Sequence, residues 1–464
     1  MAPSSVLLAI LSLVSYVHGH VVYPPDSQVL DSDGHVRLHA SQLTNVCKLP
    51  APLGGYLSEG HVPKGSRNSP SAPSVGTLKA KLIFVDFPDT PANDTTQTLY
   101  NDLVPGSQAW FKTSSYGRLK LSVDSDMTKF YRMPKASTAY TFNRFGAKQE
   151  LYIKDALAVS ALDFRAKKYD VLYIMPTRAA VEITFSPTKI SPTTFAGGII
   201  PNIVTFGQDL HLKYGFKLLN HETGHVIGLP DLYPSDSTGL PRGEWVGGFD
   251  IMGLINGTHP DYFAWHKWKL GWLNDEQIDC VAAAGSSKHS LAPVEIPGGV
   301  KAIVVKLSAT SAFVVEVRSE LAPQVVNNTA CPLGMVVYTV NTLGTNSRVP
   351  PILVLNTHTN LPGCAIDRGG RLTTATVDFS RGEKSFKSVP YGINIAIDGV
   401  RNGTYDITVS WNGMVGSSSA AVPGSLSPSP WGGFPKGIGS AFGEDSEEDG
   451  NRKQTELNGP LTED

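Results

Sequence analysis

The sequence is poor in charge and contains no long apolar run. Charged residues make up 17% of its 464 residues, against about 25% in typical soluble domains. The formal net charge is −2, so no global basic field points to nucleic acid. Beyond the N-terminal segment, no run reaches the ~18 apolar residues of a membrane-spanning helix, and the polar end argues against a GPI anchor. We therefore expect neither a nucleic acid nor a membrane as partner, and we assume a monomer.

The short apolar run Val6–Val17 predicts a secretory signal peptide. It is shorter than the about 20 apolar residues that cross a bilayer. Val17 and Gly19 are small residues at the right positions for cleavage before His20, although no Lys or Arg precedes the run. We expect residues 1–19 to be removed and the protein to be secreted to the extracellular space. A buried N-terminal helix is the alternative.

Four cysteines and four glycosylation sequons agree with export. An even number of cysteines in an exported chain predicts two disulfides, with three connectivities open. Proximity along the chain favours the pairs Cys47–Cys280 and Cys331–Cys364. The sequons predict a glycoprotein modified on the surface. They are Asn93, Asn256, Asn327 and Asn402.

Composition and apolar patterning divide the mature chain into four parts. Residues 20–75 are polar and turn-rich, as in an N-terminal arm or prosegment. Residues 76–280 combine apolar runs of the buried-strand type with helical periodicity, which predicts an α/β catalytic domain. Residues 286–412 contain short β-branched runs between turns, which predicts an all-β, sandwich-like domain. Residues 413–464 carry eight acidic and three basic side chains and are predicted to form a disordered acidic tail.

A helix is predicted over residues 213–227, and it contains the sequence His-Glu-Thr-Gly-His. Side chains four residues apart share a helix face, so His221 and His225 can bind one Zn²⁺ at ~2.0–2.1 Å. Glu222 lies beside the metal and can accept a proton from water whose pKa zinc lowers to about 7. This is the HExxH pattern of metalloproteases. A capped helix with surface histidines is the alternative.

A catalytic zinc site needs a third protein ligand and one open position. Gly228 can end the helix with a positive φ, and Pro230 prevents its continuation, so the chain can bring Asp231 back to the metal. The pattern HExxHxxGxxD differs from that of metzincins in having Asp where His is usual, and Met252 fits their methionine turn. Asp231 could instead be a turn residue or a carboxylate beside the ligands, and Met252 could be core filler.

Four further segments accompany the zinc motif. They are Leu82–Asp89, Ser114–Leu119, Phe249–Gly253 and Trp265–Trp272. They resemble the opening strand, the SYG segment, the methionine turn and the AWxKxxLGW segment of the immune inhibitor A family of secreted metallopeptidases, a metzincin-like group. The resemblance covers roughly residues 78–275. It implies a metzincin-like zinc endopeptidase in which His221, His225 and Asp231 bind the metal and Glu222 is the base.

The predicted function is therefore extracellular, zinc-dependent hydrolysis of protein or peptide substrates. The first alternative is a catalytically silent secreted binding protein on a metalloprotease fold, although nothing in binding requires Glu222. The second is a copper enzyme that uses His20 as its N-terminal ligand. Cys47 could keep a zymogen inactive through a thiolate at the open zinc position, or it could lie in a disulfide. Calcium binding by loop carboxylates is possible but unsupported, because the D-x-[DN]-x-[DN]-G loop is absent.

Several aromatic residues give weaker predictions. Three tryptophans spaced as on one helix face predict packing into the core; they are Trp265, Trp268 and Trp272. His266 between them is expected to be an ordinary structural histidine. Tyr233, and less so Tyr262, could stabilise an oxyanion beside the zinc. By analogy with metzincin-like folds, an edge strand within Phe195–Val204 could pair with an extended substrate.

Overall fold

The computed structural model describes eleven stretches of the chain. They are residues 29–30, 36–37, 46–52, 57–62, 66–67, 69–142, 148–257, 261–319, 334–347, 349–357 and 375–413. Residues 1–416 belong to one compact unit, and the second unit, residues 417–464, lies outside the described residues. The predicted signal peptide, His20, Asn327, Cys331, Cys364 and almost all of the acidic tail also lie outside them.

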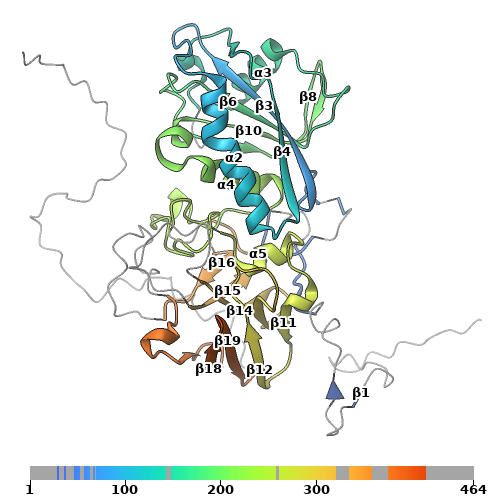
Figure 1. Ribbon diagram of the computed structural model, residues 1–464, viewed down its shortest axis with the longest axis vertical. Helices are drawn as coiled ribbons and strands as arrows, with labels where there is room; N and C mark the ends of the chain where they lie inside the picture. The colour runs from blue at the N-terminus through green and yellow to red at the C-terminus, as the bar shows by residue number, and fades with distance from the viewer. Residues whose placement is uncertain are drawn as a thin grey trace, which may run out of the picture. The chain divides into compact units, whose positions relative to one another are not determined.

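A mainly parallel sheet forms the first half of the described chain (Figure 1). Its strands run in the order β4-β3-β6-β10-β7, and β5 also pairs with β3. Only β7 is antiparallel to its neighbour, β10. The strands are β3 (Gly76–Asp86), β4 (Leu119–Ser125), β5 (Tyr131–Arg132), β6 (Val171–Pro176), β7 (Thr188–Lys189) and β10 (Ile203–Thr205).

Helices cover both faces of this sheet. Alternate side chains of a strand point to opposite faces, so Leu82 and Phe84 of β3 pack with helices α2 (Thr96–Ser114) and α4 (Phe216–Val226). Ile83 and Val85 pack on the opposite face with α3 (Gln149–Ser160). The uninterrupted apolar run in β3 therefore reflects a strand that is buried on both sides.

The segment Phe195–Val204, predicted to contain an edge strand, does not form an edge of this sheet. The glycine pair 197–198 splits this segment into a separate hairpin of β8 (Thr193–Phe195) and β9 (Gly198–Ile200), and Gly198 has a φ of +127°. After Pro201, β10 enters the sheet between β6 and β7. Among the described strands, β7 is the edge on this side.

Two further sheets form the second half of the described chain. One has the order β11-β13-β14-β15-β16 and the other β12-β19-β18-β17. Apolar side chains of both sheets, such as Val315 and Ile395, meet in one core, which makes the pair a sandwich. The strands are β11 (Ile278–Val281), β12 (Gly285–Leu291), β13 (Ala302–Lys306), β14 (Ser311–Val317), β15 (Met335–Asn341), β16 (Ile352–Val354), β17 (Ser385–Ser388), β18 (Ile393–Arg401) and β19 (Thr404–Trp411).

The sheet that contains β14 is buried on its other face as well. There, Val314 and Tyr338 belong to the same core as helix α5 (Ala264–Lys269). The Tyr338 ring lies 4.5 Å from that of Phe263, and the Ala264 N–H donates to Glu316 at 2.8 Å. The structure is therefore mixed α/β, compatible with the predicted α/β domain followed by a β-rich region, and the two halves share a core.

The described part of the N-terminal arm from Cys47 onward is built into this core. Cys47 forms a disulfide with Cys280, and Leu49 and Ala72 are buried among the core residues. The Trp272 indole N–H donates to the Ser74 carbonyl at 2.7 Å. The predicted Cys47–Cys280 pair is thus present, and the hypothesis that a Cys47 thiolate occupies the zinc position is wrong, because its sulfur is bonded to Cys280.

The tryptophan cluster is buried as predicted, with Trp265, Trp268 and Trp272 each at most 1% exposed. The helix α5 ends at Lys269, however, and Gly271, with a φ of +77°, turns the chain before Trp272. Trp272 therefore reaches the core from a loop and not from the helix face.

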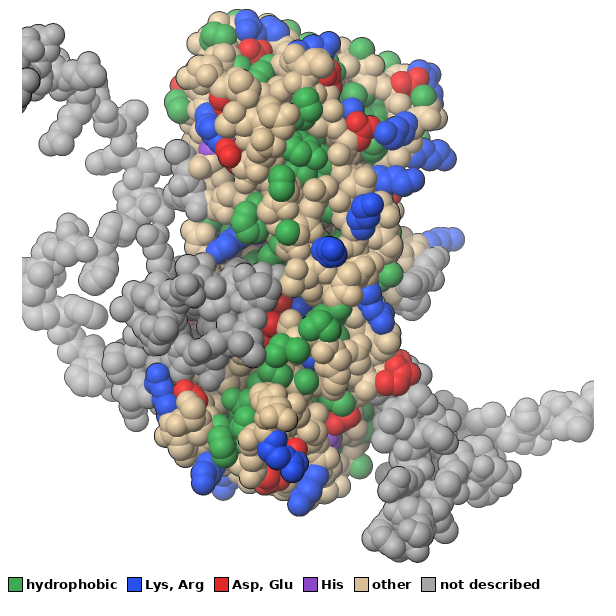
Figure 2. Space-filling view, viewed as in Figure 1, with side chains coloured by type: hydrophobic (Ala, Val, Ile, Leu, Met, Phe, Trp, Pro, Cys, Tyr) green, Lys and Arg blue, Asp and Glu red, His purple; other side chains and the backbone are tan. Residues whose placement is uncertain are grey.

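The described surface carries charges of both signs. Lys and Arg side chains are scattered over the face in Figure 2, with Asp and Glu between them. In the described residues, no helix has both the length and the apolar character to span a membrane. Asn93, Asn256 and Asn402 are exposed, as glycosylation acceptors need to be.

Candidate metal centre

Helix α4 presents the two histidines of the motif on one face. It starts at Phe216 and not at the predicted residue 213, because Gly215, with a φ of 55°, separates it from the π-helical turn Leu210–Tyr214. The rings of His221 and His225 lie one helical turn apart, with centroids 4.9 Å from each other. Both Nε2 atoms face Asp231.

The chain turns back after α4 to bring Asp231 to these histidines. Gly228 has a φ of +101°, and the Leu229 N–H donates to the Gly224 carbonyl at 3.0 Å. A Cβ at Gly228 would lie 2.5 Å from the Pro70 ring. Asp231 Oδ1 lies 3.4 Å from His221 Nε2 and 3.2 Å from His225 Nε2. The structure thus brings the three predicted ligands together, with ligand atoms within 4.8 Å of one another.

Backbone carbonyls set the orientation of both imidazoles. The Nδ1 atom of His221 lies 2.7 Å from the Ile251 carbonyl oxygen, and that of His225 lies 2.9 Å from the Leu229 carbonyl oxygen. A carbonyl only accepts hydrogen bonds, so each Nδ1 carries a proton and Nε2 is the nitrogen left to bind a metal. Metal-binding histidines are held in this way.

The charge and hydrogen bonding of the Asp231 carboxylate are suited to binding a cation. Within the described part of the chain, its buried Oδ1 forms no hydrogen bond of proper geometry despite the two nearby imidazoles. Burial lowers the pKa of His225, but the Asp231 carboxylate outweighs it and raises this pKa to about 9. The histidines in turn hold the pKa of Asp231 well below its usual range against the effect of burial. Two imidazole nitrogens and one carboxylate oxygen are donors that zinc accepts.

Glu222 lies next to the ligands without joining them. Its side chain is buried, and its carboxylate accepts a hydrogen bond from the Thr188 hydroxyl on edge strand β7. Burial raises the pKa of Glu222, although His221 and His225 partly offset this. A buried carboxylate with a raised pKa is suited to proton transfer. The sequence did not reveal Thr188, because a strand of two residues leaves no pattern.

Met252 lies against α4 at Gly224, which stands between the two histidines in the sequence. It is fully buried, and a Cβ placed on Gly224 would lie only 2.5 Å from its sulfur. The carboxylate of Asp250 accepts the Met252 N–H at 2.8 Å, and the Met252 carbonyl accepts the Leu232 N–H at 2.9 Å. This turn therefore supports both the helix and the segment that carries Asp231.

We expect Gly224→Ala to destabilise the protein. The added methyl group would meet the Met252 sulfur and the Tyr262 hydroxyl at 2.5 and 2.8 Å, and overpacking a core typically costs about 1–3 kcal/mol. Denaturant unfolding of the metal-free protein measures the loss. Gly399→Ala is the control, because its glycine has open space at the Cβ position and no positive φ. A free energy of unfolding that falls no more for Gly224→Ala than for Gly399→Ala would contradict the close packing.

The two tyrosines considered as oxyanion stabilisers lie in different places. The Tyr233 ring stacks 6.3 Å from that of His221, close to the ligands, and the Arg242 guanidinium lies 5.0 Å from its centroid. Tyr262 is fully buried, and its hydroxyl donates to the Asn220 carbonyl at 3.2 Å. Tyr262 is therefore a core residue, and its proposed oxyanion role is wrong.

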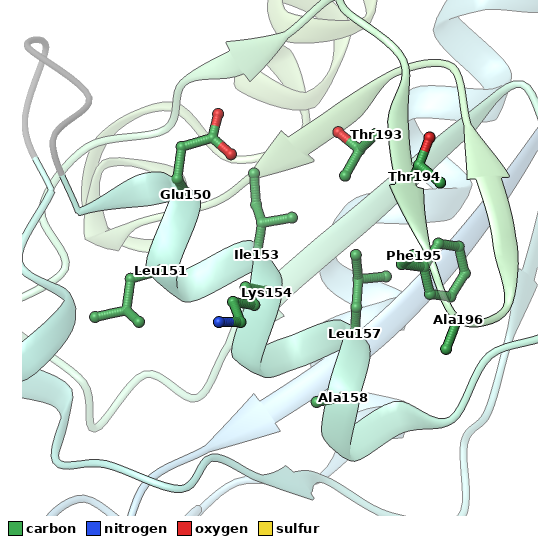
Figure 3. Close-up of a pocket in the computed structure, with 10 residues that line it drawn as sticks. All are labelled: Glu150, Leu151, Ile153, Lys154, Leu157, Ala158, Thr193, Thr194, Phe195 and Ala196. Atoms are coloured by element: carbon green, nitrogen blue, oxygen red, sulfur yellow. The ribbon is translucent and has the colours of Figure 1, made fainter.

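A separate cavity lies between α3 and the β8–β9 hairpin (Figure 3). Its volume is about 530 Å³, and Ile153, Leu157 and Phe195 provide much of its apolar lining. Glu150 and Lys154 also line it, but none of the residues of the candidate metal centre does. The cavity therefore belongs to a different part of the α/β region.

No family model matches the chain, and no curated protein matches it. The resemblance to the immune inhibitor A family therefore stays a prediction from the quoted segments. Two of those segments do pack together: the Arg118 guanidinium donates to the Gly271 carbonyl at 2.9 Å, and the Lys267 ammonium lies 4.8 Å from the Tyr116 ring centroid.

Proposed function

We propose that this protein is a secreted, metzincin-like, zinc-dependent endopeptidase. One observation carries the proposal: three ligand atoms from His221, His225 and Asp231 converge, while the buried Glu222 lies beside them without contributing a ligand. Zinc bound there would supply a Lewis acid that polarises a scissile carbonyl and lowers the pKa of water.

Each polar side chain then has a role in hydrolysis. Glu222 accepts a proton from the attacking water and donates it to the leaving amine. The Thr188 hydroxyl holds the Glu222 carboxylate by a hydrogen bond. Ile251 and Leu229 hold the imidazoles through their carbonyls, so both Nε2 atoms stay beside Asp231.

Edge strand β7 supports an extended peptide as substrate. Among the described strands it pairs on one side only, with β10. Its Thr188 touches Glu222, so a peptide that adds to this edge by backbone hydrogen bonding would pass close to the base. This strand replaces the segment Phe195–Val204 as the proposed docking edge.

Metal removal tests the proposal. We expect the secreted protein to cleave denatured casein, to lose this activity with o-phenanthroline, and to regain it with added zinc. Metal analysis accompanies the assay, because two imidazoles and one carboxylate also suit Fe(II), and because copper would favour the enzyme that uses His20. Full zinc occupancy without cleavage would instead favour a catalytically silent binding protein.

A further inference from the structure

Glu59 is a carboxylate of the N-terminal arm that is completely buried beside helix α5. Its Oε1 lies 2.8 Å from Nε2 of His266, and its backbone carbonyl accepts the Trp265 indole N–H at 2.9 Å. The arm around it is folded on itself, since His61 and Leu49 share a backbone hydrogen bond of 2.8 Å. The Cys47–Cys280 disulfide fastens this piece to strand β11.

His266 connects Glu59 to the turn beneath the metal centre. Its second ring nitrogen, Nδ1, lies 2.7 Å from Oδ2 of Asp250. The other oxygen of Asp250 accepts the Met252 N–H. Two carbonyls of this turn accept hydrogen bonds at the metal centre. The Ile251 carbonyl accepts one from the ring of His221, and the Met252 carbonyl accepts one from the N–H of Leu232, the residue after Asp231.

The charge of His266 is stabilised by the carboxylates of Glu59 and Asp250. His266 is completely buried, which lowers its pKa, but the two carboxylates outweigh this and raise its pKa to about 9. It is therefore protonated at neutral pH and donates one hydrogen bond to each carboxylate. A buried charge that loses one partner is strongly destabilised. Removal of the Glu59 carboxylate therefore destabilises the position of the His266 ring, and with it that of Asp250.

A second contact leads from the same arm to the other side of the centre. The Lys269 ammonium donates to the carbonyl of Ser58, next to Glu59, and to the carbonyl of Gly228 at 3.1 Å. Gly228 is the residue at which the chain turns back toward Asp231. The arm therefore contacts, through α5, both segments that place the metal ligands.

We propose that Glu59 is a positioning residue of the metal centre, acting through His266 and Asp250 on the turn that orients His221 and the Asp231 segment. The inference rests on the proposed zinc site. It also means that the arm from Cys47 onward is part of the working enzyme and is not released as a prosegment.

Zinc affinity and the spectrum of the cobalt-substituted protein test this role independently of hydrolysis. We expect Glu59→Gln to weaken zinc binding, measured by chelator competition, about tenfold, the lower end of the range for groups that orient metal ligands. The visible bands of the Co²⁺ form should shift, because they report the ligand geometry.

Lys301→Met is the matched control. Lys301 is also completely buried, and its ammonium donates to the Pro293 carbonyl at 2.8 Å in the β-rich region. This variant should lower the melting temperature, while its zinc affinity stays within about twofold of wild type. An equal loss of affinity in both variants, or a folded Glu59→Gln protein with wild-type affinity and spectrum, would overturn the proposal.

Two further outcomes are also decisive. If Glu59→Gln does not fold, Glu59→Asp, which keeps the charge on a shorter side chain, enters the same titration, and unchanged affinity in it rejects the role. A wild-type protein that binds no zinc would refute the metal centre itself, and with it the role of Glu59.

Discussion

Replacing Glu222 with glutamine should abolish most peptide hydrolysis and leave the zinc in place. The amide cannot accept the proton of the attacking water, and general acid–base catalysis by one side chain typically contributes about 10²–10⁴-fold. Zinc should stay bound, because Glu222 is not among the three converging ligands. Initial rates of casein cleavage and the metal content of the same sample measure the two effects together.

Stability separates this variant from a misfolded one. Burial raises the pKa of Glu222, so the ionised carboxylate is disfavoured in the folded protein. Glutamine keeps the shape and can still accept from Thr188, so the melting temperature should equal or exceed that of wild type. Glu150→Gln is the control, because Glu150 pairs with Lys189 of the same edge strand from an exposed position, and it should retain activity. More than a tenth of the wild-type rate in Glu222→Gln would exclude Glu222 as the base.

Replacing Asp231 with asparagine should cost more zinc affinity than any change beyond the ligands. The neutral amide removes the negative charge that lies 3.2 and 3.4 Å from the two imidazole nitrogens. Changes to groups that only orient ligands lower metal affinity about 10–100-fold. We therefore expect the loss of a ligand charge to lower zinc affinity more than about 100-fold. Chelator competition at fixed pH measures it.

Two companion variants sharpen the test of Asp231. Asp231→His supplies a third imidazole, as in the metzincin pattern, and should bind zinc within about tenfold of wild type. Asp236→Asn changes an exposed carboxylate a few residues along, 3.5 Å from Arg242, and should bind zinc as wild type does. Wild-type affinity in Asp231→Asn would show instead that this carboxylate lies beside the ligands and does not bind the metal.

Local rules were sufficient to predict which residues converge as candidate metal ligands. The helical repeat alone places His221 and His225 on one face, and Gly228 with Pro230 forces the turn that returns Asp231. The apolar run in β3 likewise predicts a strand buried on both faces. These features depend on residues close together in the sequence, so the printed chain determines them without knowledge of the rest of the fold.

Only the tertiary structure decided what surrounds and supports that site. Thr188 meets Glu222 from an edge strand too short to leave a pattern, and a glycine pair turned the expected edge strand into a hairpin. The sequence predicted only a polar arm or prosegment for residues 20–75, yet Glu59 in it is completely buried and bonded to a histidine 207 positions away. Hydrogen bonds between such distant residues depend on how the layers pack, which neither local propensity nor apolar periodicity encodes.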